Sequence, residues 1–118
     1  MSIPSGRTPG PRLADDLAEL DNNLYGFMHR TPASGLERLA QDFLQLGWRV
    51  SKSAWDEYDV ECTWSEMNLF NAGGIVTFAG VVDPVRVDEL AGTLRSLGVD
   101  YEIELYDRAG ELIRTLRP

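Results

Sequence analysis

Carboxylates recur at every second residue in two short stretches of the chain. Glu57, Asp59 and Glu61 form the first series, and Glu102 and Glu104 form the second. Because successive side chains of a β-strand point to opposite faces, this spacing places each series on one face of a strand. The chemistry that such a face offers is the attraction of cationic groups.

An aromatic residue adjoins each carboxylate series. Trp55-Asp56 precedes the first series and Tyr106-Asp107 follows the second. Aromatic side chains among acidic ones are typical of a surface that binds a basic protein. The alternative is a solvated sheet face whose charges only keep the protein soluble. We predict a partner-binding face composed of Trp55, Asp56, Glu57, Asp59, Glu61, Glu102, Glu104 and Tyr106.

The same residues do not predict a metal site or an enzyme. The carboxylates lack the Asp-x-Asp-x-Asp-Gly pattern and the distal Glu of a calcium loop. His29 is the only histidine, and no Gly-x-Ser-x-Gly elbow is present. Gly73-Gly74 lacks the Gly-x-x-x-x-Gly-Lys pattern of a phosphate loop. Cys62 alternates with apolar neighbours and is expected to be buried. We therefore predict no catalytic residue, no cofactor and no bound metal.

The overall charge narrows the class of partner. The 118 residues include 19 acidic and 11 basic side chains, which gives a net charge of −8. Such a charge repels nucleic-acid phosphates and anionic membranes, so neither is expected as a partner. A single cysteine excludes an internal disulfide and favours a reducing compartment, so we predict a cytoplasmic protein. The oligomeric state is not indicated.

The first half of the chain shows a tail, two helical patterns and two strand patterns. Residues 1–12 are rich in Pro and Gly and predict a flexible tail, followed by a single domain over residues 13–118. The first helix is expected over residues 13–24, although residues 24–29 also suit a short strand. The second is expected over residues 34–46, because Ser34 and Glu37 match a capping box and Gly47 follows the helix.

Strands are then expected over residues 48–55 and 58–64. The alternation of the second strand slips at Ser65-Glu66, which predicts a β-bulge that turns Met67, Leu69 and Phe70 into the core. An exposed apolar tip is the alternative for these three residues.

The second half of the chain is more regular. The almost continuous apolar run over residues 75–82 predicts a central strand covered on both faces. Asp83-Pro84 predicts the start of a helix that ends before Gly98. Strands are expected over residues 101–106 and 112–116, joined by a hairpin turn over residues 107–110.

An internal similarity organises these elements. The segment from Leu36 to Asp56 aligns without a gap with the segment from Val87 to Asp107, at an offset of about fifty residues. A duplication and the shared rules of helix capping and packing explain this equally well. Either way, we predict an α+β fold with one mixed or antiparallel sheet of about five strands and two or three helices on one face.

These observations favour a non-catalytic, acidic protein-binding module. By analogy of size, charge and compartment, it would act as an inhibitor or a bacterial immunity-type protein that neutralises a basic partner such as a nuclease toxin. The alternative is a small-molecule or metal-sensing domain with a cleft between the two repeated halves. A third possibility is a structural subunit whose sheet edge pairs with a second copy.

Overall fold

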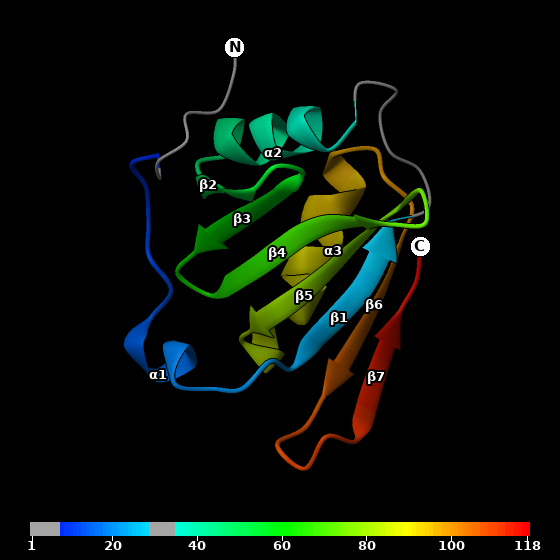
Figure 1. Ribbon diagram of the computed structural model, residues 1–118. Helices are drawn as coiled ribbons and strands as arrows, with labels where there is room; N and C mark the ends of the chain where they lie inside the picture. The colour runs from blue at the N-terminus through cyan, green and yellow to red at the C-terminus, as the bar shows by residue number, and fades with distance from the viewer. Residues whose placement is uncertain (1–7, 29–34) are drawn as a thin grey trace.

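A computed structural model describes residues 8–28 and 35–118. Within them, seven strands form one antiparallel sheet in the order β2-β3-β4-β5-β1-β6-β7 (Figure 1). The α+β class is confirmed, but the sheet has seven strands instead of about five. The strands are β1 (Leu24–Met28), β2 (Arg49–Ala54), β3 (Glu57–Cys62), β4 (Ser65–Ala72), β5 (Ile75–Val82), β6 (Tyr101–Tyr106) and β7 (Leu112–Leu116). The helices are α1 (Asp15–Ala18), α2 (Gly35–Gln45), η1 (Pro84–Arg86) and α3 (Val87–Ser96).

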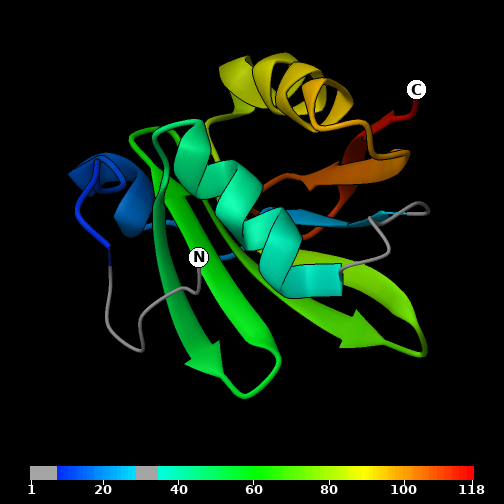
Figure 2. The same ribbon diagram turned by 90° about the horizontal axis from the view of Figure 1, so that it is seen from above.

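Helices α2 and α3 lie on the same face of this sheet (Figure 2). The chain passes through α2 between β1 and β2, and through α3 between β5 and β6. Each connection crosses over at least one other strand, because the strands that it joins are not neighbours in the sheet. Both connections cross on the same side of the sheet (Figure 2). The apolar side of each helix is buried by this contact: Leu36, Leu39, Ala40 and Phe43 in α2, and Val87, Leu90, Ala91 and Leu94 in α3.

The hydrophobic core fills the space between the two helices and the sheet. Burial of one large apolar side chain stabilises the fold by about 1.5–3 kcal/mol. The ring of Trp48 lies between Phe43 and Trp64, with centroid distances of 5.0 and 5.5 Å. The sheet contributes every second residue of its strands to this core: Leu24, Met28, Val50, Tyr58, Val60, Cys62, Met67, Leu69, Val76, Phe78, Val82, Tyr101, Ile103 and Leu105.

The helix predicted over residues 13–24 is much shorter than expected, and the alternative strand expected over residues 24–29 is the element that forms. Helix α1 ends at Ala18, and the segment from Leu24 becomes a central strand paired with β5 and β6. Asn23 supports the entry into this strand with its side chain. Its Nδ2 donates to the Val82 carbonyl and its Oδ1 accepts from the Val82 N–H, both at 2.9 Å. A side-chain amide therefore mimics one rung of the sheet, which the leucine spacing does not reveal.

A turn, not a β-bulge, separates β3 from β4. Cys62 pairs with Ser65, and Val60 pairs with Met67. This pairing keeps Met67 and Leu69 on the helix-covered face, as predicted for the core, and both are fully buried. Phe70 alternates with them and lies on the opposite face, so its predicted place in the core is wrong.

Strand β5 occupies the middle of the sheet, as predicted, but helices cover only one of its faces. Val76, Phe78 and Val82 are buried under the helices. Thr77 and Ala79 alternate with them and are only half-buried on the other face. The apolar run of β5 therefore continues onto a face that α2 and α3 do not cover, where Val81 is nevertheless buried.

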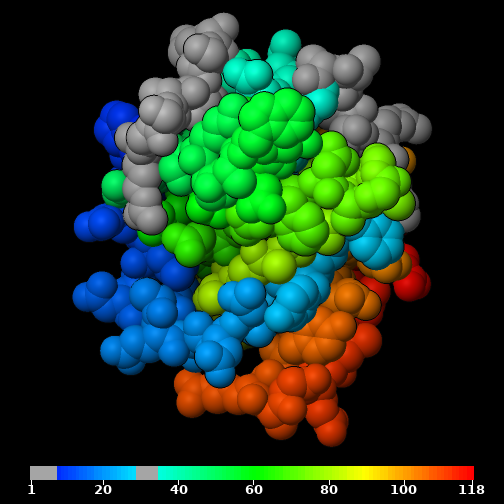
Figure 3. Space-filling view, viewed as in Figure 1, coloured from blue at the N-terminus to red at the C-terminus, as the bar shows by residue number. Residues whose placement is uncertain are grey.

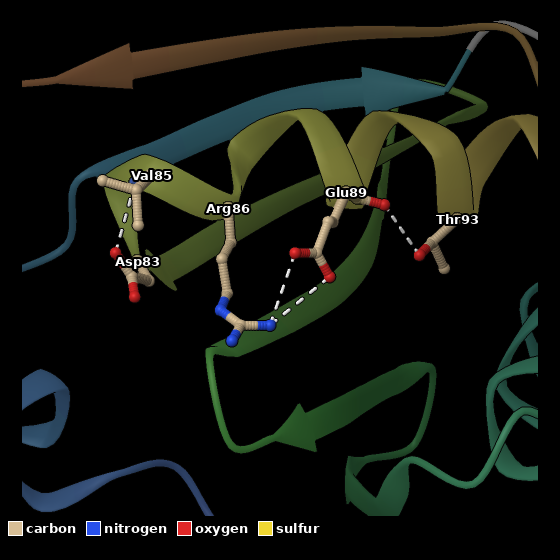
Figure 4. Close-up of polar contacts among 5 residues, drawn as sticks. All are labelled: Asp83, Val85, Arg86, Glu89 and Thr93. Carbon is tan, nitrogen blue, oxygen red and sulfur yellow. Dashed lines mark hydrogen bonds and ion pairs between the residues drawn. The ribbon is translucent and has the colours of Figure 1, made fainter.

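The start of α3 has the predicted cap (Figure 4). The Val85 N–H donates to Asp83 Oδ1 at 3.2 Å, which satisfies one of the amides exposed at the beginning of η1. One turn later, Arg86 pairs with Glu89 at 3.3 Å, and the Thr93 hydroxyl donates to the Glu89 carbonyl at 2.9 Å. These local contacts stabilise the first turns of the helix that crosses from β5 to β6.

The described part of the predicted tail lies along β2. The Thr8 N–H donates to the Val50 carbonyl at 2.8 Å, and Thr8 Oγ1 accepts from the Val50 N–H at 2.9 Å. The Leu13 N–H then donates to Glu61 Oε2 at 2.7 Å. This segment covers part of the outer edge of β2, which would otherwise present unpaired backbone groups. Residues 1–7, Ser34 of the predicted capping box, and His29 lie outside the described residues.

The two similar segments form α2-β2-β3 and α3-β6-β7. Each is a helix followed by a hairpin, and the two hairpins form the opposite edges of the sheet. The predicted turn of the second hairpin is confirmed: Asp107 Oδ1 accepts from the N–H groups of Ala109 and Glu111, both at 2.9 Å.

The packing of β1 yields a test of the core. A Cβ atom at Gly26 would overlap the Glu102 carbonyl and the Phe78 ring. We expect Gly26→Ala to lower the free energy of unfolding by about 1–3 kcal/mol, since overpacking forces neighbours to move. Gly92 lies exposed in α3 with open space around it, so Gly92→Ala should raise the free energy by up to about 1 kcal/mol. Urea unfolding of both variants measures these changes, and equal effects would contradict the packing.

Candidate functional site

The sheet face opposite α2 and α3, which we call the open face, is the candidate site (Figure 3). It consists of the side chains that alternate with the buried ones along each strand. Its carboxylates are Glu57, Asp59 and Glu61 on β3, Glu66 on β4, and Glu102 and Glu104 on β6. Two guanidinium groups lie beside these carboxylates: Arg49 stands opposite Glu61 in the sheet register, and Arg117 pairs with Glu102.

The predicted orientation of both carboxylate series is correct, but the series are not adjacent. Strands β4, β5 and β1 lie between β3 and β6. Four steps of about 4.8 Å between neighbouring strands place the two series roughly 19 Å apart. The open face therefore has two acidic borders instead of one continuous acidic field.

The strip between these borders carries apolar side chains that are exposed or half-buried, except for Val81, which is buried. It also includes the polar side chains of Glu66, Asn68 and Thr77. Tyr25 and Phe27 come from β1, Ala79 and Val81 from β5, and Phe70 from β4. Tyr25 is 41% exposed. The sequence alone does not predict this strip, because Phe70 is expected in the core and a strand over residues 24–29 is only an alternative to the end of a helix. The alternation over residues 24–28 was the signal that could have revealed it.

The β3 border is held by contacts with polar neighbours. Asp59 accepts a hydrogen bond from Asn68 Nδ2 at 2.9 Å. Glu61 accepts one from the Leu13 N–H and is only 8% exposed, so the N-terminal segment covers it. Within the described part of the chain, no Arg or Lys forms an ion pair with Glu57 or Asp59. These two carboxylates are the part of the β3 border that is available to a partner.

The β6 border combines a carboxylate paired with arginine and one held by a tyrosine. Glu102 pairs with Arg117, whereas Glu104 Oε1 accepts a hydrogen bond from the Tyr106 hydroxyl at 3.2 Å. Tyr106 also meets Tyr25 edge-on, with ring centroids 5.5 Å apart and an interplanar angle of 86°. Desolvation, together with the neighbouring Glu104 carboxylate, raises the pKa of the Tyr106 phenol above its ordinary value. The phenol therefore stays a neutral donor at physiological pH.

The two predicted aromatic residues lie at opposite corners of the sheet. Trp55 follows β2 in the turn to β3 and is 89% exposed, beside Asp56. Tyr106 is the last residue of β6. It lies at the end of the sheet where β2 starts, with Arg49, whereas Trp55 lies at the other end, where β2 stops. The structure therefore does not bring Trp55 and Tyr106 together, and each accompanies a different acidic border.

A hollow of about 850 Å³ adjoins Tyr106 at the end of the sheet. It lies between the α1 region and the turn that joins β6 to β7, not between the two repeated halves. Its lining combines apolar surface with the carboxylates of Asp16, Glu19 and Asp21, and Asp107 is already occupied by hydrogen bonds within its turn. The lining includes Asp16, Glu19, Leu20, Asp21, Asn22, Asn23, Pro84, Tyr106, Arg108 and Ile113.

Other candidate chemistry finds little support. Among residues 8–28 and 35–118, no group of three or more His, Cys, Asp or Glu side chains is arranged to hold a metal ion. Cys62 is buried, as predicted, and burial raises the pKa of its thiol. A thiol with a raised pKa forms little thiolate, which is the reactive species.

The chain matches no protein-family model, no curated protein and no solved structure. Over the described residues, none of the helices has the length and apolar character needed to cross a membrane.

The pairing of Tyr106 with Glu104 predicts a measurable pH dependence. Because the pKa of the Tyr106 phenol is higher in the folded protein than in the unfolded chain, the phenol contributes to the stability of the fold. This contribution is complete below the unfolded-state pKa near 10, and it is lost as pH rises through the folded-state pKa. We expect Glu104→Gln to lower the Tyr106 pKa towards its ordinary value, although burial still raises it. Asp59→Asn, made on the opposite border, should leave it unchanged. Titration of ¹³C-labelled tyrosine by NMR measures both, and an unaltered pKa in Glu104→Gln would contradict the contact.

Proposed function

We propose that this protein is a non-catalytic binding module that holds a basic protein against its open face, in the manner of an inhibitor or immunity-type protein. The observation that supports this proposal is a sheet face, left uncovered by α2 and α3, on which a strip with apolar side chains lies between two carboxylate borders. An apolar centre with a polar rim is the general anatomy of a protein–protein interface.

The apolar strip is the first support for a partner. A sheet face left to solvent normally carries polar side chains. Here Tyr25, Phe27 and Phe70 lie at least partly exposed on that face, and the exposed Trp55 stands at its corner. Contiguous exposed apolar surface is a typical mark of an interaction site. When a partner removes these side chains from water, their burial contributes favourably to the free energy of binding.

Charge supports a basic partner. The carboxylates of the open face outnumber its guanidinium groups, in line with the net charge of −8. Borders of one sign accelerate association with a surface of opposite sign and disfavour acidic partners. The attraction weakens as salt screens it over about 8–10 Å.

The dimensions of the face suit a protein ligand. Six steps of about 4.8 Å across seven strands give roughly 29 Å, and six residues along a strand give roughly 20 Å. A face of about 600 Å² approaches the roughly 800 Å² that each partner buries in a standard interface.

The proposed inhibitor role follows from the function of basic surfaces on proteins that bind nucleic acid. A protein that acts on nucleic acid binds phosphates through Lys and Arg side chains. An acidic module that covers those side chains blocks that activity without any catalysis of its own. A nuclease toxin is the type of partner that fits this description.

A small-molecule site is the second candidate function, because the hollow beside Tyr106 offers about 850 Å³ of space. A metabolite bound there would raise the melting temperature of the isolated protein. The binding module alone gives no such shift, so a thermal melting screen discriminates between the two functions.

The proposal predicts capture of a basic protein that depends on salt and on the open face. Immobilised protein should retain this partner at about 50 mM salt and release it at about 500 mM salt. With the purified partner, Glu104→Lys should weaken binding by about tenfold or more, and Trp55→Ala by a similar factor. Isothermal titration calorimetry measures both affinities.

The matched control is Glu37→Lys, which makes the same charge change at an exposed position of α2, on the other side of the molecule. Its affinity should stay within about twofold of the unmodified protein, since α2 lies on the side of the sheet that the partner does not contact (Figure 2). If Glu37→Lys weakens binding as much as Glu104→Lys does, only the net charge matters and the proposed face is wrong.

A further inference from the structure

The pairing of β1 with β6 brings two aromatic rings and one carboxylate together on the open face. Tyr25 lies directly opposite Glu104 in the sheet register. The rings of Tyr25 and Tyr106 meet edge to face at 5.5 Å. The Tyr106 hydroxyl donates to Glu104 Oε1 at 3.2 Å and holds that carboxylate beside the rings.

This group is open to a ligand. Tyr25 is 41% exposed, and its neighbour on the β5 side is Ala79, whose small side chain leaves room beside the ring. Within the described residues, Glu104 forms no ion pair with Arg or Lys. A carboxylate has about four acceptor positions, so the bond from Tyr106 leaves most of them available.

The same strand already holds one arginine in a similar way. Glu102, two residues before Glu104 on the same face, pairs with Arg117 of this chain through the guanidinium Nε. The β6 border therefore presents two carboxylates of one orientation, one occupied by an arginine and one not.

We propose that Tyr25, Tyr106 and Glu104 form the anchoring point for an arginine side chain of the basic partner, an inference that rests on the proposed function. A guanidinium group is planar and weakly hydrated, so it stacks on an aromatic ring while it donates to a carboxylate. A lysine ammonium group is compact and strongly hydrated, so it gains the charge attraction but less from the rings. The site therefore selects arginine over lysine.

Two capped peptides of six residues, hexa-arginine and hexa-lysine, test this selection on the whole protein. NMR titration should give the largest shift changes at Tyr25, Glu104 and Tyr106. The arginine peptide should bind about two- to fivefold more tightly than the lysine peptide, the range expected for a cation–π contact at an exposed site.

Three variants test whether the preference for arginine depends on the aromatic ring of Tyr25 or only on the apolar surface of that side chain. Tyr25→Leu should make the two affinities equal, whereas Tyr25→Phe should keep the preference. Phe70→Leu is the matched control, because it removes an aromatic ring from β4 on the same face and should leave the preference intact. A urea unfolding transition shows that each variant is folded before it is titrated.

The outcomes distinguish this inference from the proposed function. If both peptides bind the open face with equal affinity and Tyr25→Leu changes nothing, the arginine anchor is wrong and the acidic binding face stands. If the shift changes lie on α2 and α3, or if neither peptide binds, both proposals are overturned.

Discussion

Two helices cover one face of a seven-stranded sheet, and the other properties of the molecule depend on this one-sided cover. The pleat of each strand sends alternate side chains to opposite faces. The covered face collects the apolar core, whereas the open face collects the carboxylates of β3 and β6 and the aromatic side chains of β1. Helices α2 and α3 of the two crossing connections lie on the same side, so they leave the open face uncovered (Figure 2).

The strand order then decides how the open face is divided. Because β1 enters between β5 and β6, it separates the acidic borders and places Tyr25 beside Glu104. The N-terminal segment covers part of β2 and the carboxylate of Glu61. The apolar strip, the carboxylates of Glu57, Asp59 and Glu104, and the corner with Trp55 remain for a partner. This combination of apolar centre and acidic rim is the observation on which the proposed binding function rests.

Local patterns predicted much of this arrangement and failed where distant segments meet. Alternation correctly placed Glu57 and Glu104 away from the core, and the Asp83-Pro84 signal correctly placed the start of the helix before β6. The helical spacing of leucines at residues 13–24 was overridden, because β1 gains two strand partners in the middle of the sheet and Asn23 extends that pairing. The distance between Trp55 and Tyr106 depends on strand order, which no local pattern encodes.

Hydroxyl-radical footprinting of the complex with the captured basic partner tests the central claim most directly, because it reports the exposure of individual side chains on both sides of the molecule. The account predicts that Tyr25 and Trp55 become protected from oxidation. Val85 and Leu46, which are exposed outside the open face, should react as in the free protein. Protection of Val85 and Leu46 with unchanged oxidation of Tyr25 and Trp55 would contradict the account.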